Sequence, residues 1–373
     1  MEDPTPPTFT APQRRQFAKK LLAWFSTAAR DLPWRRTRDL YSIWISEIML
    51  QQTQVATVIG YHERFLAAFP NVAALAAAEE TQVLRLWEGL GYYRRARQLH
   101  TAAKKIVAEH GGDFPRSYEA VRALPGIGRY TAGAILSIGL DQRLPILEAN
   151  TIRVFSRLIA LADDPRTTRS QARLWTFAEE ILPAENCGAF NQALMELGSE
   201  ICTPKAPSCA VCPVSAHCAV YAQGRTAEIP LAAKKTTYTD LTETAVVVRR
   251  GSKFLIRQCQ PGERWAGLWD FPRFSSPPAS HESWLPTASD HLLNWLDVQI
   301  EPIAHLATTK HGVTRFRITL HVLDATWIAG GKTSAQQRWV TRDELHELPL
   351  SVTGRKIAGL LAPAKPARKK VKS

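Results

Sequence analysis

Leu124-Pro125-Gly126-Ile127-Gly128-Arg129-Tyr130-Thr131-Ala132-Gly133 shows most clearly how the first half of the chain folds. Two glycines one residue apart stand directly before a helical run. Such a turn exposes successive backbone amides at a helix N-terminus, where they suit a phosphate oxygen. A Gly-x-Gly alone is often only a tight turn. The proline in front, the small residues behind and the basic composition favour phosphate contacts at Gly126, Ile127, Gly128 and Arg129.

Charge and composition narrow the class of partner. The 373 residues include 47 Lys and Arg against 34 Asp and Glu, a formal net charge of +13. This excess favours nucleic acid first and an anionic membrane second, although a basic protein without such a partner has the same composition. The first 15 residues lack the apolar core of a secretory signal, and no apolar run reaches membrane-spanning length. We therefore expect a cytoplasmic protein without membrane contact.

The residue pattern changes once along the chain. A length of 373 residues exceeds that at which one hydrophobic core stops growing. Apolar residues recur at helical spacing from about 17 to 221, and short strand patterns follow beyond 244. The predicted parts are a flexible N-terminus at 1–15, an all-α domain at 16–224, a linker at 225–243, an α+β domain at 244–362 and a basic disordered tail at 363–373. Within the α+β domain we expect a β-hairpin from 245–248 and 254–256, a strand at 316–327, and short helices at 291–296 and 342–350.

Four of the six cysteines lie in one short segment, with the spacing C-x6-C-x2-C-x5-C. They are Cys202, Cys209, Cys212 and Cys218. This spacing allows one loop to enclose a metal centre, and thiolates select zinc or iron-sulfur, between which the spacing does not choose. Four clustered cysteines argue against a disulfide framework and for a structural metal site in a reducing compartment.

Two acidic residues stand among apolar and amide neighbours. Glu47 lies in Trp44-Ile45-Ser46-Glu47-Ile48-Met49-Leu50-Gln51-Gln52-Thr53, and Glu148 lies in Ile146-Leu147-Glu148-Ala149-Asn150. Burial would raise the pKa of Glu47 and suit it to general acid catalysis. On the sequence alone, a surface position for Glu47 on a polar stripe is slightly better supported. Glu148 has the alternative of a helix-capping carboxylate.

These motifs resemble the helix-hairpin-helix glycosylase superfamily that includes endonuclease III, and most closely its MutY branch. The resemblance covers about Trp34 to Leu361, and its cysteine spacing implies a [4Fe-4S] cluster. The second domain resembles the MutT-like domain of that branch, and it lacks the paired glutamates with which a pyrophosphate hydrolase holds magnesium. The resemblance therefore implies that this domain reads the lesion. The motifs that carry it are Glu47 with Gln51-Gln52-Thr53, Gly89-Leu90-Gly91-Tyr92-Tyr93, Leu124 to Arg129, the four cysteines, Ala266-Gly267-Leu268-Trp269-Asp270-Phe271-Pro272 and Arg338-Trp339-Val340.

The resemblance implies a monomeric, nucleoid-associated glycosylase that removes adenine mispaired with 8-oxoguanine or guanine from duplex DNA after flipping it out. Glu47 would protonate adenine at N7, and Glu148, with Asn150 beside it, would stabilise the positive charge on the sugar. Tyr130 stands where lyase-active relatives carry a lysine, and a phenol cannot form a Schiff base. The residues expected to contact or wedge the DNA are Gln51, Gln52, Thr53, Leu90 and Tyr92, with core packing as the alternative for Leu90.

Two motifs depart from the family pattern. Glu148-Ala149-Asn150 stands where the family has Asp-Gly-Asn, and misplacing the carboxylate by one methylene can cost about a hundredfold in rate. Val313-Thr314-Arg315 stands where relatives carry Phe-Ser-His, and Arg315 could bind a guanine edge or only a phosphate. We expect retained but altered activity. The alternatives are a thymine or uracil mismatch glycosylase and a catalytically weakened mismatch-binding protein.

Overall fold

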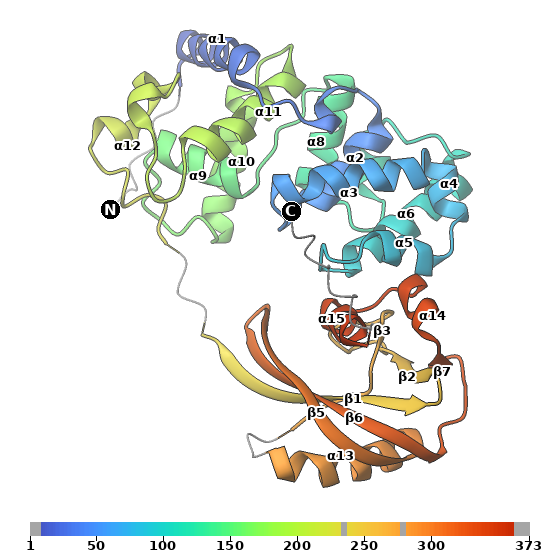
Figure 1. Cartoon of the computed structure of the whole chain (residues 1–373). Coiled ribbons are helices and arrows are strands. Elements are labelled where there is room, and N and C mark those ends of the chain that lie inside the picture. The colour runs from blue at the N-terminus through green and yellow to red at the C-terminus, as the bar shows by residue number, and fades with distance from the viewer. Residues whose placement is uncertain (1–8, 233–236, 277–280, 362–373) are drawn as a thin grey trace, which may run out of the picture. The chain divides into compact units, whose positions relative to one another are not determined.

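The computed structural model describes residues 9–232, 237–276 and 281–361, which form two compact units (Figure 1). The first unit takes in Met1–Ala78 and Arg94–Lys234, and the second takes in Glu79–Tyr93 and Lys235–Ser373. The first is helical and the second combines strands with helices, so the predicted fold class is confirmed. The segment Glu79–Tyr93 differs from expectation, because it packs with the second unit although it lies within the predicted helical domain at 16–224.

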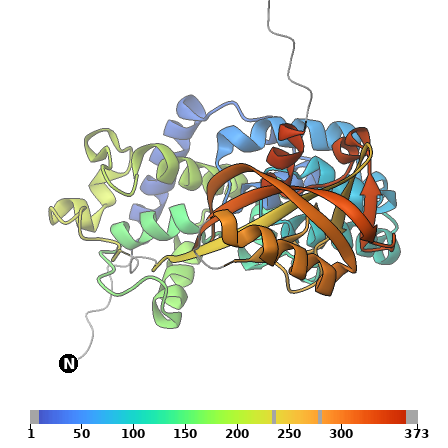
Figure 2. The ribbon, with the colours of Figure 1, turned by 60° about the horizontal axis from the view of Figure 1, so that its bottom comes forward.

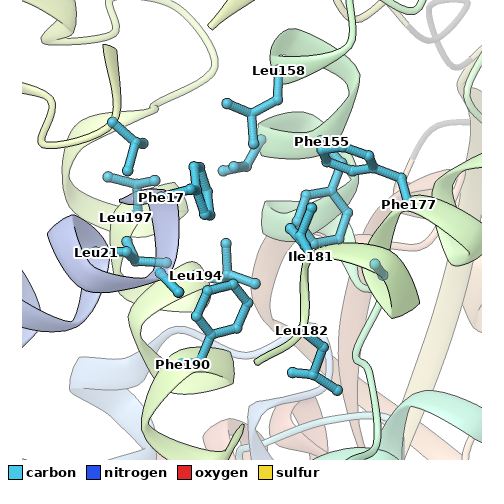
Figure 3. Close-up of a cluster of buried hydrophobic side chains, with 14 of the residues drawn as sticks. Phe17, Leu21, Phe155, Leu158, Phe177, Ile181, Leu182, Phe190, Leu194 and Leu197 are labelled. Carbon is cyan, nitrogen blue, oxygen red and sulfur yellow. The ribbon is translucent and has the colours of Figure 1, made fainter. Parts of the chain in front are cut away.

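Helices supply the regular structure of the first unit. Phe17, Phe155 and Phe190 are fully buried in its large apolar cluster, where three different helices meet (Figure 3). The elements are α1 (Ala11–Ala28), η1 (Pro33–Arg35), α2 (Leu40–Leu50), α3 (Val55–Ala68), α4 (Val72–Ala77), α6 (Arg94–His110), α7 (Tyr118–Arg122), α8 (Arg129–Leu140), α9 (Ala149–Leu158), α10 (Thr168–Ile181), α11 (Cys187–Glu196), the π-helical turn η2 (Leu197–Ile201), η3 (Cys209–Val211), η4 (Ser215–His217) and α12 (Ala219–Ala222).

Helix α2 runs through the interior of this unit. Asp39 caps it by accepting from the backbone amides of Tyr41 and Ser42, and every residue from Leu40 to Met49 is buried. It packs so closely on α8 that a β-carbon on Gly139 would meet Leu40 Cδ2 at 2.3 Å. A helix that is buried all round carries no solvated stripe. The surface position considered for Glu47 is therefore wrong.

The second unit is built on one twisted sheet, in the order β3-β2-β1-β6-β5, with β4 also paired to β1 and β7 to β2. Along β1, Ala245 and Val247 face one apolar cluster while Val246 and Val248 face the other. Helix α13 covers the second of these faces (Figure 2). The elements are α5 (Glu80–Leu86), β1 (Thr239–Arg250), β2 (Lys253–Gln258), β3 (Trp269–Asp270), β4 (Arg273–Ser275), α13 (His281–Leu296), β5 (Val298–Val313), β6 (Phe316–Gly330), β7 (Gln337–Val340), α14 (Arg342–Glu347) and α15 (Val352–Leu360).

The predicted strands are present, and they extend beyond their predicted limits. The β1–β2 hairpin pairs Arg249 with Phe254, as expected. Strand β1 begins at Thr239, inside the predicted linker at 225–243, because it pairs in parallel with β6 from Thr239 opposite Phe316. Helix α13 starts at His281 rather than 291, because Leu285 and Ala288 extend the buried face of Leu292 toward the N-terminus, and the helix accommodates Pro286 in this stretch.

Part of the N-terminus predicted as flexible is helical. Helix α1 starts at Ala11, inside the stretch predicted as flexible at 1–15, because Thr10 and Gln13 form a reciprocal capping box. The predicted basic tail at 363–373 lies outside the described residues. Within the described residues, no helix has the length and apolar character needed to cross a membrane.

Candidate active site

Glu47 lies in the last half of α2 and is 4% exposed. Burial raises its pKa to about 7, with the nearby Glu148 adding to the rise, while a hydrogen bond from Tyr130 and the charge of Arg35 act against it. A carboxyl group with a pKa near neutrality holds its proton at working pH and can still release it. This position suits a general acid.

Tyr130, at the start of α8, points its hydroxyl at this acid. The phenol donates to Glu47 Oε2 at 2.7 Å and lies 3.4 Å from Met195 Sδ. Burial and the neighbouring carboxylates raise the pKa of Tyr130 well above its ordinary value. The phenol therefore stays protonated and holds one face of the Glu47 carboxyl group in place.

Glu148 caps helix α9. Its two carboxylate oxygens accept from the backbone amides of Asn150 at 2.8 Å and Thr151 at 2.9 Å. Burial raises its pKa, and these two hydrogen bonds oppose the rise by stabilising the charged form. The helix-capping alternative is thus present in the structure, and its two hydrogen bonds act against the rise in the pKa of Glu148.

These three side chains line one pocket of about 510 Å³. Glu47, Tyr130 and Glu148 lie in its wall, and the predicted residues Gln51, Gln52, Thr53 and Asn150 complete part of it. Residues that the sequence did not single out line the rest. They include Arg30, Trp34, Arg35, Gln192, Met195, Glu196 and Ser199.

Glu196 forms the charged end of the pocket wall. Its side chain is fully buried, and it binds Arg30 Nη2 at 2.7 Å and Arg35 Nη2 at 2.9 Å. Burial alone would raise the pKa of Glu196, but the hydrogen bonds from the two arginines outweigh it and lower the pKa to about 2. This carboxylate is therefore a fixed charge and not a proton donor. No local motif marked it, because Arg30 and Glu196 are separated by 166 positions.

Arg153 of α9 and the turn η2 hold Asn150 in place. Asn150 Oδ1 accepts from Arg153 Nη2 at 2.8 Å, and Arg153 Nε donates to the Cys202 carbonyl at 2.7 Å. A β-carbon on Gly198 would meet Asn150 Cβ at 2.6 Å, so only glycine allows η2 to approach this closely. The Glu148-Ala149-Asn150 motif is therefore fixed on both sides.

The residues of the hairpin at 124–129 do not line this pocket. Gly126 has φ +80° and Ile127 is buried, while Gly128 is the N-cap of α8. Arg129 stacks 3.8 Å from the centroid of the Trp175 ring and is paired with Glu179. The hairpin thus presents a glycine turn at a helix start, as the sequence led us to expect.

The other predicted DNA contacts lie in the second unit. Leu90 is buried, in agreement with its core-packing alternative, whereas Tyr92 is 50% exposed and has φ +47°. Thr314 and Arg315 form the turn between β5 and β6, because Val313 pairs with Phe316. Thr314 has φ +52°, which is rare for a β-branched residue.

The four clustered cysteines line one small cavity of the first unit. Burial raises the pKa of Cys212 to about 11, and the other three cysteines add to the rise. Arg157 Nη1 lies 3.2 Å from Cys202 Sγ. All six cysteines are free. Among the described residues, no set of three or more Cys, His, Asp or Glu is drawn together into a metal site as it stands.

Comparison with known proteins agrees with this architecture. The family model described as HhH-GPD superfamily base excision DNA repair protein matches residues 45–180, and a NUDIX domain model matches residues 244–359. The adenine DNA glycosylase of Rattus norvegicus is 33% identical over 399 residues, covering 91% of this chain and 77% of the relative. That of Buchnera aphidicola subsp. Schizaphis graminum (strain Sg) is 39% identical over 261 residues, covering 70% of this chain and 75% of the relative.

A solved structure supports the same class. The structure of a thermostable thymine-DNA glycosylase is 30% identical, has a TM-score of 0.52 and covers 56% of this chain and 97% of its own. The fold and the buried acid in its pocket define a base excision repair glycosylase with an appended Nudix-like domain. Within that class, the chain belongs to the adenine DNA glycosylase family.

Proposed function

We propose that this chain hydrolyses the N-glycosidic bond of adenine mispaired with 8-oxoguanine or guanine in duplex DNA. The observation that carries the proposal is Glu47, a buried carboxyl group with a pKa of about 7 in the wall of a 510 Å³ pocket. A base inside a duplex cannot enter such a pocket, so adenine must be flipped out first. The two adenine DNA glycosylases named above match 91% and 70% of this chain, whereas the thymine-DNA glycosylase matches 56%, which favours adenine over thymine.

The two catalytic carboxyl groups take different parts because their surroundings differ. Glu47 is buried and receives one hydroxyl donor, whereas Glu148 receives two backbone amides at a helix start. We propose that Glu47 protonates adenine N7, which lets the base leave as a neutral molecule when its bond to the sugar breaks. Glu148 stays anionic and stabilises the positive charge that develops on the sugar, and water then adds to that carbon.

The acid role of Glu47 predicts the pH dependence of base loss. Only the protonated carboxyl group can donate, and its pKa is about 7. We expect the single-turnover rate to fall about tenfold per pH unit above pH 7, where Glu47 loses its proton. Because the Tyr130 hydrogen bond lowers the pKa of Glu47, Tyr130→Phe moves this fall to higher pH.

The matched control is Tyr118→Phe, which removes a phenol from helix α7, outside the pocket-lining set. Its pH profile should coincide with that of the unchanged protein. A rate that rises with pH through 7, or a profile that Tyr130→Phe leaves in place, contradicts the acid role.

We propose that Cys202, Cys209, Cys212 and Cys218 hold a [4Fe-4S] cluster. Four free thiols around one cavity provide the donor set that such a cluster uses, and the Arg157 guanidinium lies beside Cys202 Sγ. A bound cluster would cross-link the four cysteines and so stabilise the loop that carries them. Zinc, which also accepts four thiolates, is the competing metal.

DNA recognition is assigned to residues of both units. We propose that the amides at Gly126, Ile127 and Gly128, together with Arg129, bind a phosphate, and that Gln51, Gln52, Thr53 and Tyr92 contact the strands around the flipped base. Tyr130 cannot form a Schiff base, so the enzyme leaves an abasic site without cutting the strand. We propose that it acts as a monomer on chromosomal DNA in the cytoplasm.

Arg315 is proposed to shift the choice of opposing base. Two guanidinium donors match the adjacent acceptors O6 and N7 of guanine, but N7 of 8-oxoguanine carries a hydrogen and cannot accept, so this two-donor contact is lost. Arg315→Ala should therefore weaken binding opposite guanine about tenfold and binding opposite 8-oxoguanine about threefold at most. Fluorescence anisotropy with both mispairs measures this.

The control for that prediction is Arg317→Ala, two residues further on in β6, whose guanidinium stacks over Tyr238. A phosphate contact at Arg315 would give a different result. Both affinities would then fall equally, and the slope of log K against log salt would shrink by about 0.9.

The experiment that tests the function uses three duplexes, with adenine opposite 8-oxoguanine, adenine opposite guanine, and thymine opposite guanine. Alkali-dependent cleavage at adenine, without cleavage before alkali, is the expected result. Loss of thymine instead would favour the mismatch glycosylase that acts on thymine. Binding without loss of any base would favour a mismatch-binding protein.

A further inference from the structure

A buried arginine closes the C-terminal end of the helix that carries Glu47. Arg95 lies near the start of α6 and is 8% exposed. Its Nη1 donates to the carbonyls of Ile48 at 2.8 Å and Met49 at 2.9 Å, and also to the carbonyl of Gln51. Its Nη2 donates to Thr53 Oγ1 at 3.2 Å. One guanidinium therefore binds both the last turn of α2 and the loop that follows.

These contacts provide hydrogen-bond donors for carbonyls that have no partner within the helix. The last four carbonyls of an α-helix have no partner within the helix, and the helix dipole makes that end negative. The chain then leaves α2 sharply, with Gln52 at φ +57°. Arg95 supplies donors and a positive charge at this place.

The four acceptors named above lie next to the pocket. Glu47 directly precedes Ile48, and Gln51, Gln52 and Thr53 are pocket-lining residues. Arg95 itself does not line this pocket, so its effect on the pocket passes through residues such as these. A displacement of about 1 Å in such a group can cost about a hundredfold in rate.

We infer that Arg95 is a positioning residue, whose guanidinium fixes the α2 end and the Gln51–Thr53 loop and thereby sets where the Glu47 carboxyl group meets the flipped base. The inference rests on the proposed function. Lysine cannot replace Arg95, because a single ammonium on a flexible stem does not reproduce a planar fork that reaches four acceptors.

The test compares Arg95→Lys and Arg95→Ala with Arg94→Lys and Arg94→Ala. Arg94 is the exposed neighbour on the same helix, and its two substitutions change size and charge in the same way as those at Arg95. Single-turnover base loss from an adenine:8-oxoguanine duplex gives a rate constant and an amplitude. We expect the rate constant of Arg95→Lys to fall about a hundredfold with its amplitude kept, and that of Arg94→Lys to stay within about threefold of the unchanged protein.

A purely structural role would give a different pattern. Loss of folded protein lowers the amplitude and leaves the rate constant of the remaining sites unchanged. If Arg95→Ala fails to fold, Arg95→Lys still decides between the two. A rate constant for Arg95→Lys within about threefold of the unchanged protein overturns the inference.

Hydrogen exchange separates this inference from the proposed function. The amides of residues 48–54 should exchange faster in Arg95→Lys than in Arg94→Lys, whether or not the protein removes adenine. Unchanged exchange at 48–54 would refute the anchoring by Arg95. An inactive unchanged protein with the expected exchange pattern would refute the proposed function alone.

Discussion

Glu47→Gln should reduce the rate of adenine loss by about 10²- to 10⁴-fold, the range that a positioned proton donor contributes. Glutamine keeps the shape of the side chain and can still accept the Tyr130 hydrogen bond, but it has no proton of suitable pKa to give to N7. Single-turnover kinetics on an adenine:8-oxoguanine duplex measures the rate, and anisotropy measures binding. DNA affinity should change by about threefold or less, because the charge of a group with a pKa of about 7 is small at pH 6.

Glu109→Gln is the matched control, since Glu109 is an exposed carboxylate on α6 that pairs with Lys105. It makes the same chemical change outside the pocket-lining set. A Glu47→Gln protein that keeps more than a tenth of the rate would show that another group donates the proton. A pure binding protein would show no base loss with or without Glu47.

Cys212→Ser should remove the metal centre. A [4Fe-4S] cluster needs all four thiolates, and a hydroxyl is a poor ligand for it. Iron and acid-labile sulfide should fall from about four per chain to a small fraction of that. The thermal midpoint of the first unit should fall with them, because a metal that binds only the folded loop stabilises it.

Cys187→Ala provides the control, because Cys187 is buried in α11 and is not one of the four cysteines that line the cavity. Its iron and sulfide contents should match those of the unchanged protein. One zinc per chain in the unchanged protein, without sulfide, would replace the cluster by a zinc site. Full iron retention in Cys212→Ser would remove Cys212 from the ligand set.

The sequence was most informative where one motif carried both a local conformation and a chemical group. The glycine turn before Tyr130 and the apolar run around Glu47 predicted helices that the structure contains. The burial of Glu47 could not be decided from its own segment, because it depends on α8 packing against α2 at Gly139. Local patterns therefore located the acid but not its environment.

Long-range contacts explain what the sequence did not reveal. Glu196 joins the pocket through Arg30 and Arg35, and no local spacing connects residues 166 positions apart. The start of β1 at Thr239 depends in the same way on pairing with Phe316. Such residues can be found only once the tertiary structure brings them together.

The departure at Glu148-Ala149 has a simple structural account. The longer carboxylate of Glu148 still reaches the amides of Asn150 and Thr151, so the cap is kept. Ala149 is the first residue of α9 and adopts an ordinary helical conformation. Glycine is therefore not needed there for a left-handed backbone, which agrees with the proposal that catalysis is retained.

The central claim is that this pocket releases adenine by protonation from Glu47. The most direct measurement is chromatographic identification of the free base after incubation of the unchanged protein and Glu47→Gln with an adenine:8-oxoguanine duplex at pH 6. One equivalent of free adenine per duplex from the unchanged protein, and about a hundredth of its rate or less from Glu47→Gln, is the predicted result. Free adenine released equally by both proteins, or no free base from the unchanged protein, would contradict the claim.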